Sequence, residues 1–215
     1  MREQVINAIL SEKLIAIVRG MEENKILPTS KALLDGGFKL VEVTFNQSNP
    51  ASFASTANAI NAIAKEFGSD VMVGAGTVCT MEQLKLAADA GATYIITPAC
   101  NPEIIAEVRR LGLVAIPGVL TPTECVAAHD AGADFVKLFP AGSMGADYLK
   151  ALRAPLNHLK FLAVGGVNEK NLTDYLAAGA SGFGIGGNLV NKDWIDAGDF
   201  NKIAELAKKY VDAVK

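Results

Sequence analysis

The sequence predicts an α/β fold, a single (β/α)₈ barrel with an extra N-terminal helix. Short β-branched apolar runs alternate with longer segments of helical period, which is the pattern of a parallel sheet built from βα units. Eight such runs in 215 residues leave about 27 residues for each unit. An open doubly wound sheet usually has fewer strands and a G-x-G-x-x-G turn after the first one, where this chain has Arg19-Gly-Met-Glu22. We therefore expect one closed barrel of the TIM type over residues 1–215.

The expected strands recur at regular intervals along the chain. They are Leu14–Val18, Leu40–Thr44, Val71–Gly74, Tyr94–Thr97, Val114–Ile116, Phe135–Leu138, Phe161–Val164 and Gly182–Ile185. The segment Arg2–Ser11 precedes the first of them and is expected to form a helix that caps the lower end of the barrel. Active sites of such barrels lie at the C-terminal ends of the strands, so polar residues there are the candidates for function.

A glycine recurs just before several of these strands, where a helix should end in the left-handed conformation. The repeats are Asp35-Gly-Gly-Phe38, Asp89-Ala-Gly-Ala92, Asp130-Ala-Gly-Ala133 and Ala178-Gly-Ala-Ser181. They indicate how the chain turns from helix to strand and carry no information about chemistry.

Composition excludes several classes of protein. The chain has 20 Lys and Arg against 23 Asp and Glu, a formal charge of -3, and no basic run, so a nucleic-acid partner is not expected. Its three cysteines, Cys79, Cys100 and Cys125, form no C-x-x-C pair, which argues against a disulfide framework and a zinc site and favours a reducing cytoplasm. The N-terminal segment lacks the unbroken apolar stretch of a signal peptide, and no 18-residue apolar run occurs, so no membrane association is expected.

Lys137 stands in the middle of an apolar strand. It shares a face with Phe135 and Phe139, while Val136 and Leu138 should pack against helices, so Lys137 should point into the barrel. Burial there would lower the pKa of its ammonium group and make a neutral amine available for attack on a carbonyl. The alternative is a lysine that snorkels from the strand end or pairs with an interior acid for a structural purpose.

Glu42 shows the same anomaly with the opposite charge. It shares a face with Thr44, while Val41 and Val43 occupy the other face. Inward-facing layers draw their side chains from alternate strands, so Glu42 on the second strand and Lys137 on the sixth can reach one cavity. An inward lysine beside an inward glutamate is the composition of a Schiff-base site with a proton-transfer group. A structural ion pair is the alternative, although burying both charges is costly.

Further candidates lie at other strand ends. The loops after the seventh and eighth strands contain Gly165-Gly166 and Gly184-Ile-Gly-Gly-Asn188, and these loops commonly hold phosphate in barrel enzymes. The alternative is that they are only tight turns. Thr77 and Pro98 are placed to line the cavity wall. Arg19 could bind a carboxylate or be a solvated arginine. His129 and His158 fit neither a triad nor a metal cluster and are expected at the surface.

These motifs resemble the 2-keto-3-deoxy-6-phosphogluconate (KDPG) and 4-hydroxy-2-oxoglutarate (KHG) aldolase family over essentially the whole chain. The matching segments are VEVTFN at 41–46, GAGTV at 74–78, TPA at 97–99, PGVLTPTE at 117–124, VKLFPA at 136–141, GGVN at 165–168 and the glycine-rich GIGGNL ending at Leu189. The glutamate-containing second strand combined with the VKLFP strand is the most specific part of the resemblance.

The resemblance implies a class I aldolase that needs no metal or other cofactor, acts on a small keto acid and is usually a homotrimer. In this pattern Lys137 forms the imine and Glu42 moves protons, partly through water. Thr77, Pro98 and Phe139 match positions around the pyruvate moiety, and Arg19 matches an arginine near the bound acid. The glycine loops, with Gly165, Gly166, Gly186, Gly187 and Asn188, would bind the phosphate.

Three positions depart from the family pattern. Many gluconate-type members have arginine where this chain has Asn46, and asparagine there resembles the branch that acts on 6-phosphogalactonate derivatives. Val164 stands where threonine is common, and Asn188 stands where serine is common. Each change alters a polar contact to the distal half of the substrate, so the bond-breaking machinery looks intact while substrate choice stays open.

The leading hypothesis is reversible cleavage of 2-keto-3-deoxy-6-phosphogluconate to pyruvate and glyceraldehyde 3-phosphate, with 4-hydroxy-2-oxoglutarate as a second substrate that would yield glyoxylate. The 6-phosphogalactonate isomer is the alternative substrate. Two more distant hypotheses keep the barrel but change its role: a phosphosugar isomerase or epimerase with Glu42 as base, and a catalytically silent barrel that senses phosphometabolites.

Overall fold

The computed structural model describes residues 1–215, apart from the side chain of Glu23. Helices and parallel strands alternate along the chain. The strands are β1 (Leu14–Arg19), β2 (Leu40–Thr44), β3 (Met72–Gly76), β4 (Tyr94–Ile96), β5 (Val114–Ile116), β6 (Gly118–Val119), β7 (Val136–Leu138), β8 (Phe161–Val164) and β9 (Gly182–Ile185). The helices are α1 (Arg2–Glu12), α2 (Glu23–Asp35), the 3₁₀ helix η1 (Pro50–Ser52), α3 (Phe53–Phe67), α4 (Met81–Asp89), α5 (Pro102–Arg110), α6 (Pro122–Asp130), α7 (Ala141–Met144), α8 (Ala146–Arg153), α9 (Leu172–Ala177), α10 (Lys192–Asp196) and α11 (Phe200–Ala213).

The sheet closes into a barrel at Pro117. The strand order is β5-β4-β3-β2-β1-β9-β8-β7-β6, so β5 and β6 occupy the two ends of the sheet although a single residue separates them in the chain. β5 pairs with β4, and β6 pairs with β7. Proline has no N–H to donate to a ladder, while its carbonyl accepts a hydrogen bond from the Lys137 N–H at 2.8 Å. The expected fifth strand is present as β5, and the unpredicted β6 extends the same barrel position beyond Pro117, so nine strand segments fill eight barrel positions.

The predicted barrel is confirmed, with small shifts at strand ends. The third strand runs over Met72–Gly76 rather than Val71–Gly74, and the sixth begins at Val136 rather than Phe135. The four repeated glycines before strands do adopt left-handed conformations, with φ between +91° and +99°, at Gly37, Gly91, Gly132 and Gly179. No helix in the described chain is long and apolar enough to cross a bilayer.

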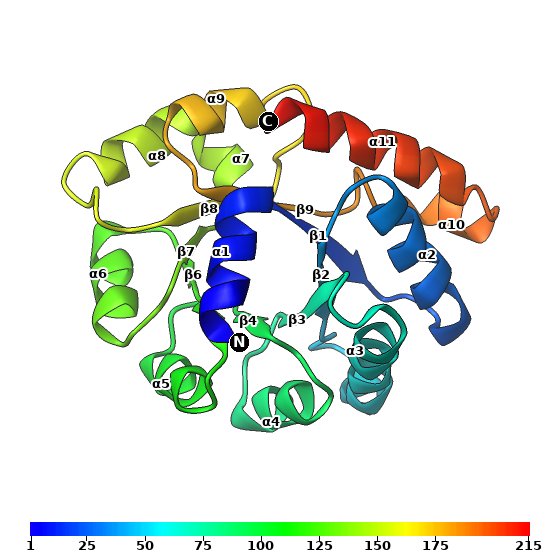
Figure 1. The fold of residues 1–215 in the computed structure, drawn as a ribbon. Coiled ribbons are helices and arrows are strands. Elements are labelled where there is room, and N and C mark those ends of the chain that lie inside the picture. Colours follow the sequence, from blue (N-terminus) through cyan, green and yellow to red (C-terminus); the bar gives the residue numbers. More distant parts are fainter.

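The lower end of the barrel is covered by α1, as predicted. Figure 1 shows this helix lying across the middle of the ring of outer helices. Its Val5 and Ile9 pack with apolar side chains inside the barrel. Arg2 of α1 is paired with the carboxylate of Asp134, which also accepts hydrogen bonds from Arg109 at 2.8 Å and from the Ala115 N–H at 3.0 Å. Asp134 thus ties α1 and α5 to the edge of the sheet.

Two apolar layers surround the strands. The larger layer lies between the strands and the outer helices and includes Val41, Val43, Val136 and Leu138. The smaller one fills the barrel interior and consists of Val5, Ile9, Ile15, Ile17, Leu40, Tyr94, Ile96, Val114, Ile116, Phe135, Leu162 and Val164. This division confirms the face assignments predicted for the second and sixth strands, and it leaves Glu42 and Lys137 as buried charged residues on the inner face.

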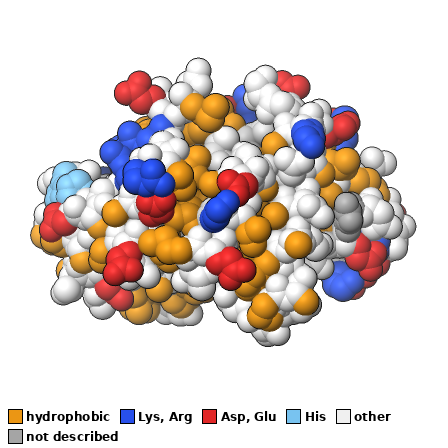
Figure 2. Space-filling model, turned by 90° about the horizontal axis from the view of Figure 1, so that it is seen from below, with side chains coloured by type: hydrophobic (Ala, Val, Ile, Leu, Met, Phe, Trp, Pro, Cys, Tyr) orange, Lys and Arg blue, Asp and Glu red, His pale blue; other side chains and the backbone are white. Residues whose placement is uncertain are grey.

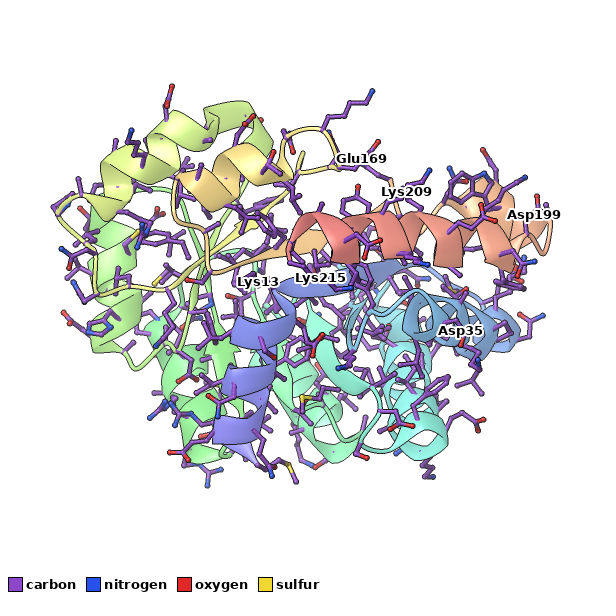
Figure 3. All side chains as sticks on the ribbon, turned by 45° about the horizontal axis from the view of Figure 1, so that its top comes forward. Lys13, Asp35, Glu169, Asp199, Lys209 and Lys215 are labelled. Carbon is purple, nitrogen blue, oxygen red and sulfur yellow. The ribbon has the colours of Figure 1, made fainter. Side chains whose placement is uncertain are left out.

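Helix α11 closes the outer ring against α2. Figure 3 shows Asp35, the last residue of α2, below α11, and Lys13 near the end of α11 where Lys215 lies. Lys13 Nζ donates a hydrogen bond to the Val214 carbonyl at 3.1 Å. The two helices meet so closely that a Cβ on Gly36 would lie 2.4 Å from Ala207 Cβ and 2.6 Å from the Ala204 carbonyl oxygen.

Replacing Gly36 by alanine should therefore destabilise the fold. The added methyl meets backbone as well as side chain, so α11 must move, at a cost of about 1–3 kcal/mol in the free energy of unfolding. Urea unfolding followed by circular dichroism measures this cost. Gly187→Ala is the control because a Cβ there meets no atom within 4 Å; equal stabilities of the two variants would contradict the packing argument.

Candidate active site

Lys137 and Glu42 lie on opposite sides of the barrel interior. Lys137 is 4% exposed and lies between Gly118 of β6 and Leu162 of β8. Glu42 is 1% exposed and lies between Ile17 of β1 and Gly74 of β3. Both side chains project into the barrel interior because each occupies an inward position of its strand.

Burial shifts the pKa of each group in the direction that favours its neutral form. Loss of hydration lowers the pKa of the Lys137 ammonium, with Arg19 acting in the same direction and Glu42 against it. Loss of hydration likewise raises the pKa of the Glu42 carboxyl, against the attraction of Lys137 and Arg19. An amine that can lose its proton beside a carboxyl that can hold one is suited to proton transfer and nucleophilic attack on a carbonyl.

Glu42 and Lys137 influence each other's charge, but no ion pair joins them directly among the described residues. Glu42 itself leans over Gly76, where a Cβ would lie 1.6 Å from its Oε1. The absence of a side chain at Gly76 therefore makes room for the carboxylate.

Two further predicted residues meet the glycine loops at the upper end of the barrel. The Lys137 Nζ lies 4.8 Å from the centroid of the Phe139 ring, and that ring lies against the loop after β8, since a Cβ on Gly165 would be 3.0 Å from it. Arg19 at the end of β1 lies beside the loop after β9, because a Cβ on Gly186 would be 3.1 Å from its Nη1. The sequence did not indicate that Arg19 and this loop are neighbours.

Thr77 is held by a hydrogen-bond chain that the sequence analysis missed. It has φ of 55°, and its carbonyl accepts a hydrogen bond from Gln47 Nε2 at 2.7 Å. Gln47 Oε1 in turn accepts from the buried Gln83 at 3.0 Å. Gln83 also forms a capping box with Thr80 at the start of α4. The Thr-x-x-Gln pattern of this box is the feature of the sequence from which the role of Gln83 could have been predicted. The chain fixes the loops after β2 and β3 relative to each other.

Pro98 and Asn46 lie at the mouth in different settings. Pro98 is half-buried. Its carbonyl oxygen lies so close to Gly118 that a Cβ atom on Gly118 would be only 2.3 Å from this oxygen. Asn46 is exposed, and its Oδ1 accepts hydrogen bonds from the N–H and hydroxyl of Ser48 at 3.1 and 2.8 Å. It borders a hollow of about 310 Å³ between the ends of β1 and β2 and helix α3.

The remaining candidate residues lie at two ends of the barrel: the glycine loops at the upper end and the two histidines at the lower end. Gly166 packs against Gly142 of α7, whereas Gly187 and Asn188 are exposed at the end of β9. His129 and His158 are exposed, as predicted, with their ring centroids 5.0 Å apart. Figure 2 shows histidine side chains at the surface beside basic ones. These two residues line a groove with Arg2 and Asp134 at the lower end of the barrel, away from the strand ends that carry Lys137.

A closed barrel with a desolvated lysine and a carboxyl group in its interior belongs to the class of barrel enzymes that act on carbonyl compounds. The chain matches the family model described as KDPG and KHG aldolase over residues 5–206, and it belongs to that family. It is an aldolase, a carbon–carbon lyase. Family membership supports neither the isomerase nor the silent-sensor hypothesis.

Individual relatives agree with this assignment. A probable 2-dehydro-3-deoxy-6-phosphogalactonate aldolase of Rhizobium meliloti is 37% identical over 206 residues, covering 95% of this chain and 94% of the relative. A 2-dehydro-3-deoxy-phosphogluconate aldolase of Treponema pallidum is 33% identical over 212 residues, with coverages of 98% and 97%. A solved KDPG aldolase of Legionella pneumophila, with pyruvate captured as a covalent carbinolamine, superposes with a TM-score of 0.85 at 28% identity, covering 94% and 96% of the two chains.

Replacing Gly76 by alanine should impair catalysis by displacing Glu42. The new methyl would occupy the position of the Oε1 atom, and loss of a positioned acid–base group typically costs 10²-fold or more. We expect kcat for aldol cleavage to fall by about 100-fold while circular dichroism stays unchanged. Wild-type kcat in this variant would contradict the placement of Glu42.

Proposed function

We propose that the chain is a class I aldolase that cleaves a 2-dehydro-3-deoxy-6-phospho sugar acid to pyruvate and glyceraldehyde 3-phosphate through an imine on Lys137. The observation that carries this proposal is the burial of Lys137 in an apolar barrel whose inner face also carries the buried Glu42. The covalent carbinolamine in the Legionella pneumophila relative supports it, since a carbinolamine precedes an imine.

The reaction begins with attack of the neutral Lys137 amine on the C2 carbonyl carbon. The carbonyl π electrons move to oxygen, which takes a proton and leaves as water after Glu42 has moved protons between nitrogen and oxygen. The resulting iminium accepts the electrons of the C3–C4 bond as Glu42 removes the proton of the C4 hydroxyl, and C4 becomes the aldehyde carbon of the released product. Protonation of the enamine at C3 and hydrolysis then release pyruvate and restore the amine.

The other mouth residues are assigned to substrate binding in this proposal. Phe139, Thr77 and Pro98 surround the pyruvate portion, with Phe139 lying beside the Lys137 amine. Arg19 binds the carboxylate. The backbone N–H groups of the two glycine loops, at Gly165, Gly166, Gly186, Gly187 and Asn188, bind the phosphate.

We infer that the galacto isomer is the preferred substrate. Two observations favour it over the gluconate isomer that the motifs first suggested: Asn46 replaces the arginine of many gluconate-type members, and two relatives with 34–37% identity are named as phosphogalactonate aldolases. The two isomers differ only in configuration at C4, so they give the same products, and cleavage of 4-hydroxy-2-oxoglutarate is a further activity to measure.

The remaining parts of the proposal concern the setting of the enzyme. We infer that residues 1–215 act as one catalytic domain, as a homotrimer in the cytoplasm, with no metal or cofactor. Family resemblance supports the trimer, and three cysteines without disulfide partners support a reducing compartment.

Borohydride reduction in the presence of pyruvate tests the imine. The peptide that contains Lys137 should gain the mass of a reduced pyruvyl group in mass spectrometry, and Lys137→Ala should lose both this adduct and about 10⁴-fold or more in kcat. Lys160→Ala is the matched control, since Lys160 also lies over an aromatic ring, that of Phe135, but is exposed. Absence of an adduct on the wild-type enzyme would overturn the proposal.

Exchanging Asn46 for arginine tests substrate choice. The new guanidinium would add charge beside the hollow that Asn46 borders, and we expect the ratio of kcat/KM for the gluconate isomer over the galactonate isomer to rise by about 10-fold. Steady-state assays of both isomers measure this ratio. Asn49→Arg places the same charge on the same hollow and should leave the ratio near the wild-type value; a wild-type enzyme that prefers gluconate would refute the inferred preference.

A further inference from the structure

Two polar atoms inside the barrel have no hydrogen-bond partner. They are the hydroxyl oxygen of Tyr94 on β4 and the Oε2 atom of Glu42 on β2, each fully buried. A buried donor or acceptor without a partner costs about 1–3 kcal/mol, so two of them in one cavity require an explanation. The donor is a phenol and the acceptor a carboxylate, which makes the pair complementary.

The sheet register brings the two side chains toward each other. Glu42 is paired with Gly74 on β3, and pairing of Ala75 with Ile95 places Gly74 beside Tyr94. The Tyr94 ring fills the space over Gly74: a Cβ there would lie 2.2 to 2.5 Å from its Cε2, Cδ2 and Cζ atoms. Because Gly74 has no side chain, none intervenes between the tyrosine and Glu42 along this row.

The two carboxylate oxygens of Glu42 therefore have different surroundings. Oε1 lies over Gly76, which is the next inward-facing residue of β3 after Gly74 and is closer than Gly74 to the mouth of the barrel. Oε2 is sealed from solvent and has no partner, and Tyr94 carries a second unpartnered polar atom among the apolar residues of the same interior.

We propose that Tyr94 is a positioning residue for Glu42, and that one water molecule held inside the barrel bridges its hydroxyl to the inner carboxylate oxygen Oε2. This inference rests on the proposed role of Glu42 as the proton-transfer group. The bridge holds the carboxylate so that Oε1 faces the reacting atoms, and it stabilises the ionised form because a hydrogen bond to the charged form favours ionisation.

The bridge opposes the dominant effect of burial. Loss of hydration raises the pKa of Glu42, and the charged groups that face it are Lys137 from β7 and Arg19 from β1, which both lower it. The pKa of the Tyr94 hydroxyl is raised well above its usual range by burial and by Glu42, so it stays protonated and donates at every working pH. Removing that donor should raise the pKa of Glu42 further, and the ionised fraction at a given pH should then fall.

Tyr94→Phe tests the proposal because it removes one oxygen and keeps the ring that packs on Gly74. The acid limb of the pH profile of kcat should move upward by about 0.5 to 1 pH unit, so that cleavage on this limb falls by about three- to tenfold, with KM close to the wild-type value. The urea midpoint should also fall, since the bridged hydroxyl contributes to stability. If the Tyr94 hydroxyl has no partner, its removal should instead raise the urea midpoint and leave the pH profile of kcat unchanged. That result would overturn the proposal.

Tyr175→Phe is the matched control. Tyr175 is also buried, and its hydroxyl donates to the Ala141 carbonyl at 2.8 Å, outside the barrel interior. This variant should lose stability but keep the wild-type pH profile, and an equal shift in both variants would count against Tyr94. Borohydride trapping of pyruvate separates the two levels of inference: no adduct on wild type refutes the aldolase mechanism, whereas a wild-type adduct with an unshifted Tyr94→Phe profile refutes only the bridge.

Discussion

Removal of water from Lys137 is the constraint on which the rest of the site depends. The amine lies on the inner face of a closed sheet whose other inner residues are almost all apolar, and this setting lowers its pKa. Closure of the sheet, the helix across its lower end and the pairing of Asp134 with Arg2 all help to separate that interior from bulk solvent. The barrel is thus both the scaffold that holds the lysine and the medium that lowers the pKa of its amine.

Space for the side chains inside the barrel comes from glycines on two strands. On β3, Gly74 makes room for the Tyr94 ring and Gly76 for the Glu42 carboxylate. On β9, Gly184 lies against Val164 and Ile17. A methyl group at either β3 position would occupy volume that the site uses, so the identity of these residues is set by packing around the site. They bear on function although they carry no functional group themselves.

The alternation of apolar runs and the face on which each residue falls were sufficient to predict the barrel, its N-terminal helix and the inward direction of Lys137 and Glu42. These are local properties, since strand periodicity places every second side chain on one face. The split at Pro117, the contact of Arg19 with the loop at Gly186, and the chain from Gln83 through Gln47 to Thr77 could not be predicted in this way. Each depends on which strand ends become neighbours and how closely they approach, which is decided only when the sheet closes.

The seam of the barrel adjoins Lys137, the proposed nucleophile. The Lys137 N–H donates to the Pro117 carbonyl, in the single residue between the two ends of the sheet, and Gly118 lies beside Lys137 in the register. Formation of this hydrogen bond requires the sheet ends to have met. A partly folded chain with an open seam leaves the same amine in water, where an ordinary lysine is protonated and inert toward carbonyls. The low-pKa amine on which the proposed mechanism depends therefore exists only in a chain whose barrel has closed.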